Sequence, residues 1–159
     1  MTAVDIRLAG VEDVDAVVAC QDACWREAYT GLVPESYLDD PLVLRRRAER
    51  WRDRLAGERR VFVAVAGGEV VGVASAGPSR DPVPEPALEL MTLYVRAGHH
   101  GSGLASSLLT AAIGAAPASL WVFEDNARAQ AFYAKHGFRL DGGTKVDEDT
   151  GVPEARMVR

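Results

Sequence analysis

A glycine-rich turn in the middle of the chain has the residue types that bind phosphate. Gly98, Gly101 and Gly103 follow a strand-like run at residues 90–95, and a helical pattern of apolar residues begins at Leu104. Glycine lets the backbone approach a ligand closely, and the first turn of a helix presents unpaired N–H groups and a positive dipole end. A strand, a glycine turn and a helix start in this order predict a phosphate-binding site.

Two common nucleotide-binding motifs fit this turn poorly. A Walker loop requires a lysine after its last glycine, and none follows Gly103. A dinucleotide fingerprint requires a third glycine where this chain has Ser106, although the acidic Glu124 lies near the expected distance. A nucleotide-binding module that uses the turn is therefore kept only as an alternative.

Two sequence blocks resemble one enzyme family. Residues 100–105, His-Gly-Ser-Gly-Leu-Ala, resemble the Gln/Arg-x-x-Gly-x-Gly/Ala turn of the GNAT superfamily of N-acetyltransferases. A block from Asn126 to Phe138 resembles the family's Asn-x-x-Ala-x-x-Phe-Tyr-x-x-x-Gly-Phe, in the same order and at the same distance. His100 stands where the family has Gln or Arg, but this change removes no backbone donor.

The resemblance implies an acyl-CoA-dependent N-acyltransferase that moves acetyl from acetyl-CoA to a primary amine by direct attack in a ternary complex. The alternative is a catalytically silent coenzyme A-binding sensor or regulatory module of the same fold. Asn126 would contact the pantetheine arm, and it suits a helix N-cap equally well. The expected cofactor-binding residues are Leu93, Tyr94, Val95, His100, Gly101, Ser102, Gly103, Leu104, Ala105, Ser106 and Asn126.

Acyl transfer to an amine requires a polarised carbonyl, a neutral amine and a proton for the departing thiolate. Backbone N–H groups near Leu93 and Val95 are our candidates for the first task. Tyr133 is the candidate donor to the sulfur, because a phenol is mostly protonated at neutral pH. The resemblance assigns Tyr133 the same role, and its alternative role is that of a core aromatic beside Phe132.

Glu89 is the candidate general base. It stands at the start of the central strand, four residues before Leu93, where many members of the family carry a catalytic or water-ordering glutamate. The alternative is an exposed carboxylate at the end of a strand. In that case the amine would lose its proton through water or arrive neutral.

The acceptor amine is the least defined part of the prediction, and a small molecule, a peptide or a protein terminus all fit. In the family, the segment between the first two helices helps to wall the acceptor pocket. This makes Trp25, Tyr29 and Tyr37 candidate substrate contacts, with core packing as their alternative role. The acidic residues 147–149 would attract a protonated amine such as a small cationic or amino-acid-like acceptor, unless they form a solvated loop.

Composition limits the class of protein. A chain of 159 residues with 48% hydrophobic residues suits a single domain over residues 1–159. The net charge of −5 argues against a nucleic-acid partner, and no apolar run approaches the roughly 20 residues that span a membrane. No metal-binding cluster is visible, so no metal is expected.

Cys20 and Cys24 are the two cysteines of the chain. Their spacing puts them on one helix face with Cβ atoms roughly 5–6 Å apart, which is too far for an undistorted disulfide. We expect two reduced, core-facing thiols and hence a cytoplasmic protein. A cysteine acyl-enzyme is the alternative mechanism, and it would require a proximity to the site that the sequence does not give.

The elements that must hold these residues follow the order β-α-α-β-β-β-α-β-α-β-β. Asp40 and Pro41 predict a helix start, Gly57 its end, and Gly67-Gly68 a hairpin turn. The arginines of that helix are expected on a solvated face, with an anion-attracting face as the alternative. The expected strands are residues 4–8, 61–66, 69–76, 90–95, 119–123, 138–140 and 155–158.

This order predicts a mixed α/β fold with helices on both faces of the sheet. The resemblance implies a GNAT-like fold, in which a central, mostly antiparallel sheet of six to seven strands has splayed fourth and fifth strands. Coenzyme A would enter that gap. We also expect an exposed C-terminal strand, which offers an edge for a homodimer.

Overall fold

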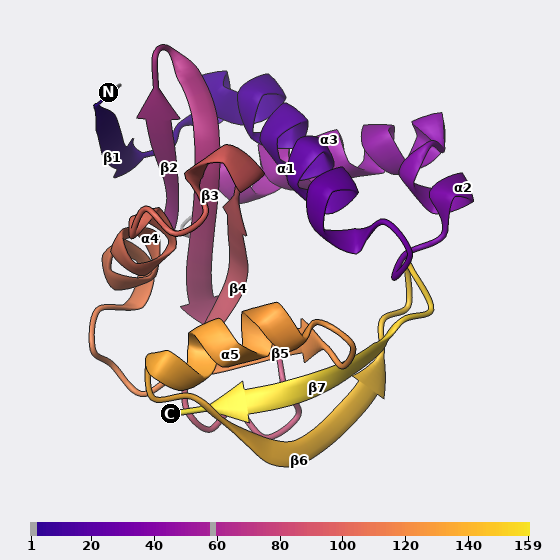
Figure 1. Ribbon diagram of the computed structural model, residues 1–159, viewed down its shortest axis with the longest axis vertical. Helices are drawn as coiled ribbons and strands as arrows, with labels where there is room; N and C mark the ends of the chain where they lie inside the picture. Colours follow the sequence, from indigo (N-terminus) through magenta and orange to yellow (C-terminus); the bar gives the residue numbers. More distant parts are fainter. Residues whose placement is uncertain (1–2, 58–59) are drawn as a thin grey trace.

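A single mixed sheet organises the structure, a computed structural model that describes residues 3–57 and 60–159 (Figure 1). Its seven strands lie in the order β1-β2-β3-β4-β5-β7-β6, and all neighbours are antiparallel except the parallel pair β4 and β5. The predicted fold class is confirmed. The strands are β1 Val4–Leu8, β2 Arg60–Ala66, β3 Glu69–Pro78, β4 Leu88–Val95, β5 Ser119–Phe123, β6 Arg139–Val146 and β7 Pro153–Val158.

Helices cover both faces of the sheet. Successive side chains of β2 and β3 point to opposite faces, and because most of them are apolar, both faces must be covered. Val63 and Val73 pack with Val17 of α1 and Trp51 of α3, whereas Ala64 and its neighbours pack under α4. No helix in the described part of the chain is long and apolar enough to cross a membrane. The helices are α1 Val14–Tyr29, α2 Glu35–Leu38, α3 Pro41–Ala56, α4 Leu104–Ile113 and α5 Ala127–Lys135, with short 3-10 turns at Val11–Asp13 and Ala97–His99.

The sheet opens between β4 and β5. The two strands pair at a single position, Glu89 with Ser119, and separate from there on. Figure 1 shows the sheet as two halves, with β1 to β4 running up the view and β5 to β7 crossing its lower part. In β4 the register with β3 also shifts, because Ser75 pairs with Thr92 and Ala76 with Leu90, which leaves Met91 as a bulge. The expected splay is therefore present.

Helix caps lie where the sequence predicted them. The Asp40 carboxylate accepts a hydrogen bond from the Leu42 N–H at 2.9 Å, and α3 ends before Gly57. At α5 the Asn126 side chain accepts from the Ala129 N–H at 3.1 Å. These caps satisfy backbone donors that a helix start leaves unpaired, so they fix where each helix begins.

The C-terminal hairpin differs from the prediction in two ways. The strand expected at residues 138–140 extends to Val146 as β6, and the strand expected at residues 155–158 begins at Pro153 as β7, so only residues 147–152 lie between them. The extension was missed because almost all of β6 is exposed and therefore lacks apolar alternation, and because its register is irregular between Leu140 and Thr144. The C-terminal strand β7 is not an edge strand but lies between β5 and β6, so β6 is the edge at this end of the sheet.

Candidate functional site

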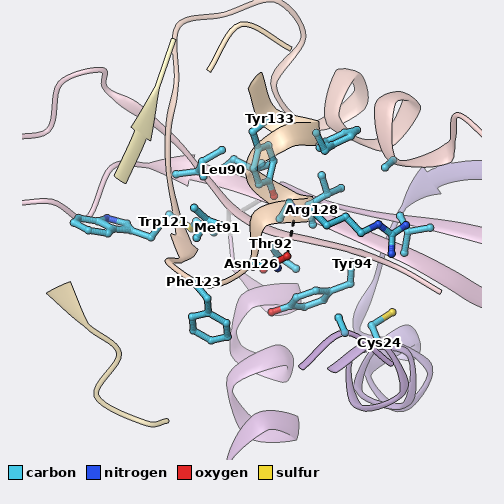
Figure 2. A pocket seen from close by; sticks show the side chains of 18 of the residues that line it. Cys24, Leu90, Met91, Thr92, Tyr94, Trp121, Phe123, Asn126, Arg128 and Tyr133 are labelled. Carbon is cyan, nitrogen blue, oxygen red and sulfur yellow. Dashed lines mark hydrogen bonds between the residues drawn. The ribbon is translucent and has the colours of Figure 1, made fainter. Parts of the chain in front are cut away.

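A cavity of about 590 Å³ lies along the opening between β4 and β5. Its walls come from both halves of the sheet, from the start of α4, from α5 and from the end of α1. Figure 2 shows the side chains that meet there, with Tyr133 of α5 and Tyr94 of β4 both reaching into the space. Of the expected cofactor residues, all line the cavity except Ser102 and Leu104.

The glycine turn forms the end of the cavity at the start of α4. Gly101 and Gly103 have φ angles of +77° and +89°, which residues with a side chain rarely adopt. No atom lies within 4 Å of the place that a Cβ atom would take at either residue. Among the described residues, the N–H groups of Ala105 and Ser106 have no acceptor. The turn thus presents open space, free N–H donors and a helix N-terminus together, which suits an anion.

The side chains around this turn take roles that the motif alone did not define. The His100 ring lies 2.9 Å from the Val95 carbonyl oxygen through Nε2, so its imidazole is held against the end of β4. Leu104 is buried in the core, which leaves only its backbone for a ligand. Ser106 Oγ lies 3.0 Å from His136 Nε2, and this contact links α4 to the end of α5.

Backbone N–H groups of β4 face the opening. Arg96 donates to the Val71 carbonyl of β3 at 2.9 Å. Because hydrogen bonds alternate along an antiparallel ladder, Tyr94 also points its N–H towards β3. The N–H groups of Leu93 and Val95 then point away from β3, towards the side where β5 has separated. These donors were selected from the sequence as those that polarise a carbonyl.

Tyr133 enters the cavity from α5. It packs beside Phe132, with ring centroids 5.4 Å apart, and no described group hydrogen bonds to its hydroxyl. Burial raises the pKa of Tyr133, and the nearby hydroxyl of Tyr94 raises it further. The phenol therefore keeps its proton throughout the neutral pH range.

Aromatic rings form the wall opposite α5. Trp25 and Tyr29 line the cavity, with ring centroids 5.1 Å apart, and Tyr29 lies 4.9 Å from Phe123 of β5. Tyr37 does not line the cavity but stacks on Trp25 at 6.0 Å. Burial raises the pKa of Tyr29 above its ordinary value. The end of α1 thus gives the cavity a rigid, largely apolar side.

Arg47 supports this wall from behind, a role that was not predicted. It is 4% exposed, and its guanidinium lies 4.9 Å from the Trp25 ring centroid and 3.8 Å from Asp22. The prediction of a solvated arginine face is therefore wrong for this residue. Burial depends on which side of α3 meets α1, and an arginine-rich helix gives no local signal of that.

Glu89 lies in the cavity wall and is 1% exposed, so the alternative of an exposed strand-end carboxylate is wrong. Both of its oxygens are engaged by Arg80. One accepts from the Arg80 backbone N–H at 3.0 Å, and the other pairs with the guanidinium at 2.5 Å. The carboxylate is thus held in a buried ion pair.

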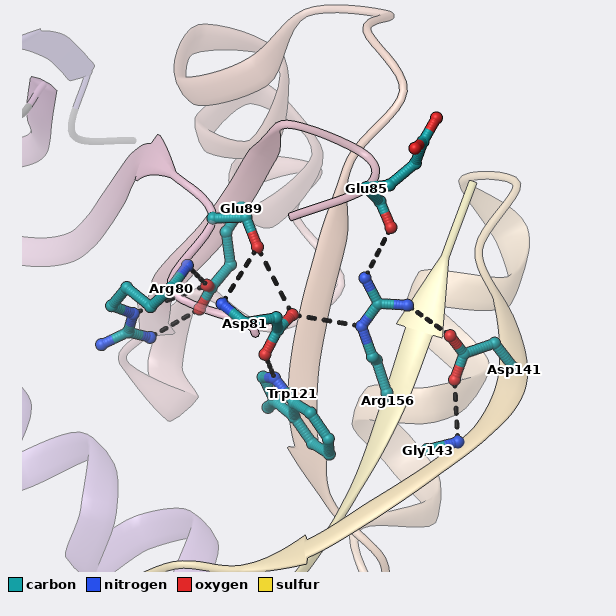
Figure 3. Close-up of polar contacts among 9 residues, drawn as sticks. Arg80, Asp81, Glu85, Glu89, Trp121, Asp141, Gly143 and Arg156 are labelled. Carbon is teal, nitrogen blue, oxygen red and sulfur yellow. Dashed lines mark hydrogen bonds and ion pairs between the residues drawn. The ribbon is translucent and has the colours of Figure 1, made fainter. Parts of the chain in front are cut away.

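The loop that carries Arg80 is fixed to the C-terminal strands (Figure 3). Asp81 accepts from the Trp121 indole at 2.9 Å and pairs with Arg156 at 3.2 Å. Arg156 also pairs with Asp141 and donates to the Glu85 carbonyl at 2.8 Å. Three segments distant in sequence therefore meet at one arginine beside the cavity.

The acidic turn after β6 is largely occupied by its own contacts. Asp147 accepts from the Thr150 hydroxyl at 2.6 Å, and Asp149 pairs with Arg50 of α3 at 2.8 Å. Asp147 still lines the cavity. The expected negative rim is thus reduced, and Glu154 of β7 lines the cavity as well.

The two cysteines are free and buried, as predicted. Cys24 lines the cavity, and its Sγ lies 4.0 Å from that of Cys20. Contact with Cys20 and burial together raise the pKa of the Cys24 thiol. A protonated thiol is a poor nucleophile, so the position of Cys24 in the cavity wall does not by itself favour an acyl-enzyme.

No group of potential metal ligands occurs among the described residues.

Comparison with known proteins gives concordant matches. Residues 21–138 match the acetyltransferase (GNAT) family. A probable N-acetyltransferase of Mycobacterium tuberculosis is 30% identical over 145 residues, covering 87% of this chain and 82% of the relative. The PaiA N-acetyltransferase of Thermoplasma acidophilum, solved with coenzyme A, superposes with a TM-score of 0.73 at 18% identity over 96% of this chain and 98% of the other.

A second solved structure has the same fold. The putative acetyltransferase YncA of Salmonella typhimurium, solved with its cofactor acetyl-CoA, has a TM-score of 0.69 at 19% identity. The match covers 99% of this chain and 93% of the other. At these identities the structural matches establish the fold, whereas the family match rests on the sequence.

Proposed function

The chain belongs to the acetyltransferase (GNAT) family, and from that premise we propose that it transfers acetyl from acetyl-CoA to a primary amine by direct attack in a ternary complex. One observation carries the proposal. A single cavity is lined by the open glycine turn, by the side of β4 that faces the opening and by Tyr133. An anion site, a carbonyl site and a proton donor are then aligned along the opening.

The residues at the α4 end fit coenzyme A. Gly101 and Gly103 leave room for a diphosphate beside free N–H groups, and a side chain at either position would occupy part of that room. Arg128 and Lys135 of α5 also line the cavity and supply positive charge. Asn126 has its oxygen bound to the Ala129 N–H, which leaves its amide NH₂ to contact the pantetheine arm.

When bound, acetyl-CoA supplies the thioester that reacts. The N–H groups of Leu93 and Val95 would hold the carbonyl oxygen and stabilise the negative charge that develops on it. Tyr133, with its proton retained, would donate to the departing sulfur. Trp25 and Tyr29 would exclude water and hold the carbon skeleton of the acceptor. The protonated Cys24 supports direct attack over a covalent acyl-enzyme.

Glu89 was proposed from the sequence as the general base. That role would require its carboxylate to release Arg80, which occupies both oxygens. We therefore propose Glu89 as a positioning residue that fixes Arg80 at the mouth of the cavity. Proton removal from the amine then needs a different group.

The function is tested by amine-dependent release of thiol from acetyl-CoA. A panel of alkylamines, amino acids and short peptides is incubated with the protein, and the acetylated product is identified by mass spectrometry. We expect thiol release and acetylated amine in equal amounts. Retained coenzyme A binding with no acetylation of any amine would instead support the silent sensor.

A further inference from the structure

A second carboxylate faces the opening from the side opposite Tyr133. Glu154 lies on β7, paired with Phe123 of β5 and Lys145 of β6. Cross-strand partners share a face, so Glu154 lies on the face of Phe123 and not on that of Val122. Val122 belongs to the core with which Tyr133 packs under α5. The two residues therefore approach one cavity from opposite faces of the sheet.

Glu154 differs from Glu89 in what its carboxylate contacts. Glu89 is fully buried and held by Arg80, whereas Glu154 is partly exposed to the cavity. No described residue donates a hydrogen bond to the carboxylate of Glu154 or forms an ion pair with it. It is thus a carboxylate of the cavity wall with its oxygens available to a ligand.

Charged and titratable groups on several elements act on Glu154. Burial raises the pKa of Glu154, and so do the negative charges of Asp147 and Glu89. The positive charges of Lys145 on β6 and of Arg80 lower it. From α1, Tyr29 is close enough for the charge of Glu154 to raise the pKa of that phenol. A carboxylate with a raised pKa accepts a proton more readily at neutral pH than an ordinary glutamate does.

We propose that Glu154 is the catalytic residue that accepts the proton of the acceptor, and that the acceptor is a primary alkylamine bound as its ammonium ion against β7. This inference rests on the proposed function. Free alkylamines have pKa values near that of lysine, about 10.4, so they arrive charged at neutral pH. A free carboxylate among the rings of Tyr29 and Phe123 suits such a cation with an apolar substituent.

The proposed reaction replaces the C–S bond of the thioester with a C–N bond. The ammonium gives one proton to Glu154 and becomes a neutral amine. The nitrogen lone pair forms the C–N bond to the acetyl carbon, the C–S bond breaks, and the sulfur takes the proton of Tyr133. The new amide nitrogen loses its extra proton to the Tyr133 phenolate through solvent, and Glu154 releases its own proton to water, so one proton is released per turnover.

The test separates a base from a residue that merely supports the wall. Wild-type protein and Glu154→Gln are assayed with benzylamine and other primary alkylamines that are charged at neutral pH. Each amine is paired with the aminooxy analogue of the same skeleton, such as O-benzylhydroxylamine, whose nitrogen is already neutral. Glu124→Gln is the matched control, because it removes the same charge from an exposed residue outside the cavity.

We expect Glu154→Gln to lower kcat/KM for alkylamines by about 100-fold or more and to leave the aminooxy analogues nearly unchanged. The acidic limb of the wild-type pH profile, where activity rises as Glu154 loses its proton, should disappear in the variant. Stabilisation by coenzyme A should persist in both variants.

Two results would overturn the proposal in different ways. If the wild type acetylates alkylamines and Glu154→Gln does so equally well, or loses both classes of nucleophile equally, Glu154 is not the base while the proposed function stands. If the wild type acetylates no amine or aminooxy compound, the proposed function fails and this inference fails with it.

Discussion

The Tyr133 hydroxyl has no protein partner among the described residues, and burial raises its pKa. A protonated phenol without a partner is available to donate a hydrogen bond to a ligand. Tyr133→Phe removes only the hydroxyl and keeps the ring that packs on Phe132 and Phe138. We expect kcat to fall about 100-fold, with thermal stabilisation by coenzyme A unchanged. Equal kcat in the variant and the wild type would show that the sulfur leaves without help from Tyr133.

Places in the cavity wall were predictable for residues in a motif and not for residues placed by tertiary packing. Tyr133 and Asn126 stand at defined places in a residue-specific block, and both were selected from the sequence. The positions of Glu154 and Arg47 were missed because they depend on strand register and on which side of α3 is buried. Neither property leaves a local pattern in the chain.

The start of α4 is the element that should determine coenzyme A affinity. Gly103 has a φ of +89° with open space at its Cβ position. Gly103→Ala should cost about 1 kcal/mol in folding stability, because alanine disfavours this conformation. Its methyl group should also lower coenzyme A affinity roughly tenfold, equivalent to about 1.4 kcal/mol, by standing where the diphosphate approaches.

Gly31→Ala provides the matched control for this prediction. Gly31 has a φ of +92°, also with no atom near its Cβ position, but it lies outside the cavity. Both variants should lose similar stability in urea unfolding, and only Gly103→Ala should lose affinity in calorimetric titration with coenzyme A. Equal affinities for the two variants would contradict a binding role for the turn.

The loop between β3 and β4 should depend on Arg156. This residue is partly buried and pairs with Asp81 and Asp141. Arg156→Ala leaves both carboxylates unpaired, and we expect a loss of roughly 2 kcal/mol in the free energy of unfolding. Because the loop carries Arg80 into the cavity wall, KM for the acceptor should rise more than KM for acetyl-CoA. Arg52→Ala, on the exposed face of α3, is the control and should change neither.

Elements bounded by capping or turn residues were predictable from the sequence, and the C-terminal hairpin was not. Asp40, Pro41 and Gly57 delimit α3, and Gly67 and Gly68 delimit the turn between β2 and β3. Strand β6 has no such signals, because an edge strand exposed to solvent needs no apolar alternation. The splay of β4 from β5 came from the family resemblance and not from residue patterns.

At the scale of the molecule, the sheet consists of two halves joined at Glu89 and Ser119. The first half contains the N–H groups of β4 that we propose hold the thioester carbonyl, and the second contains Tyr133 on α5 and Glu154 on β7. The cavity lies where the halves separate, so in the proposed function both binding and chemistry depend on that opening. A ligand that binds there should stabilise the two halves together.

Thermal unfolding with acetyl-CoA, coenzyme A, NAD and ATP in parallel tests this account most directly. A ligand at 100 times its dissociation constant adds about 2.7 kcal/mol, which for a chain of this size raises Tm by roughly 5–10 °C. We expect that rise with acetyl-CoA and coenzyme A, and none with NAD or ATP. An equal rise with NAD or ATP, or none with coenzyme A, would contradict the assignment of the opening between β4 and β5 as an acetyl-CoA site.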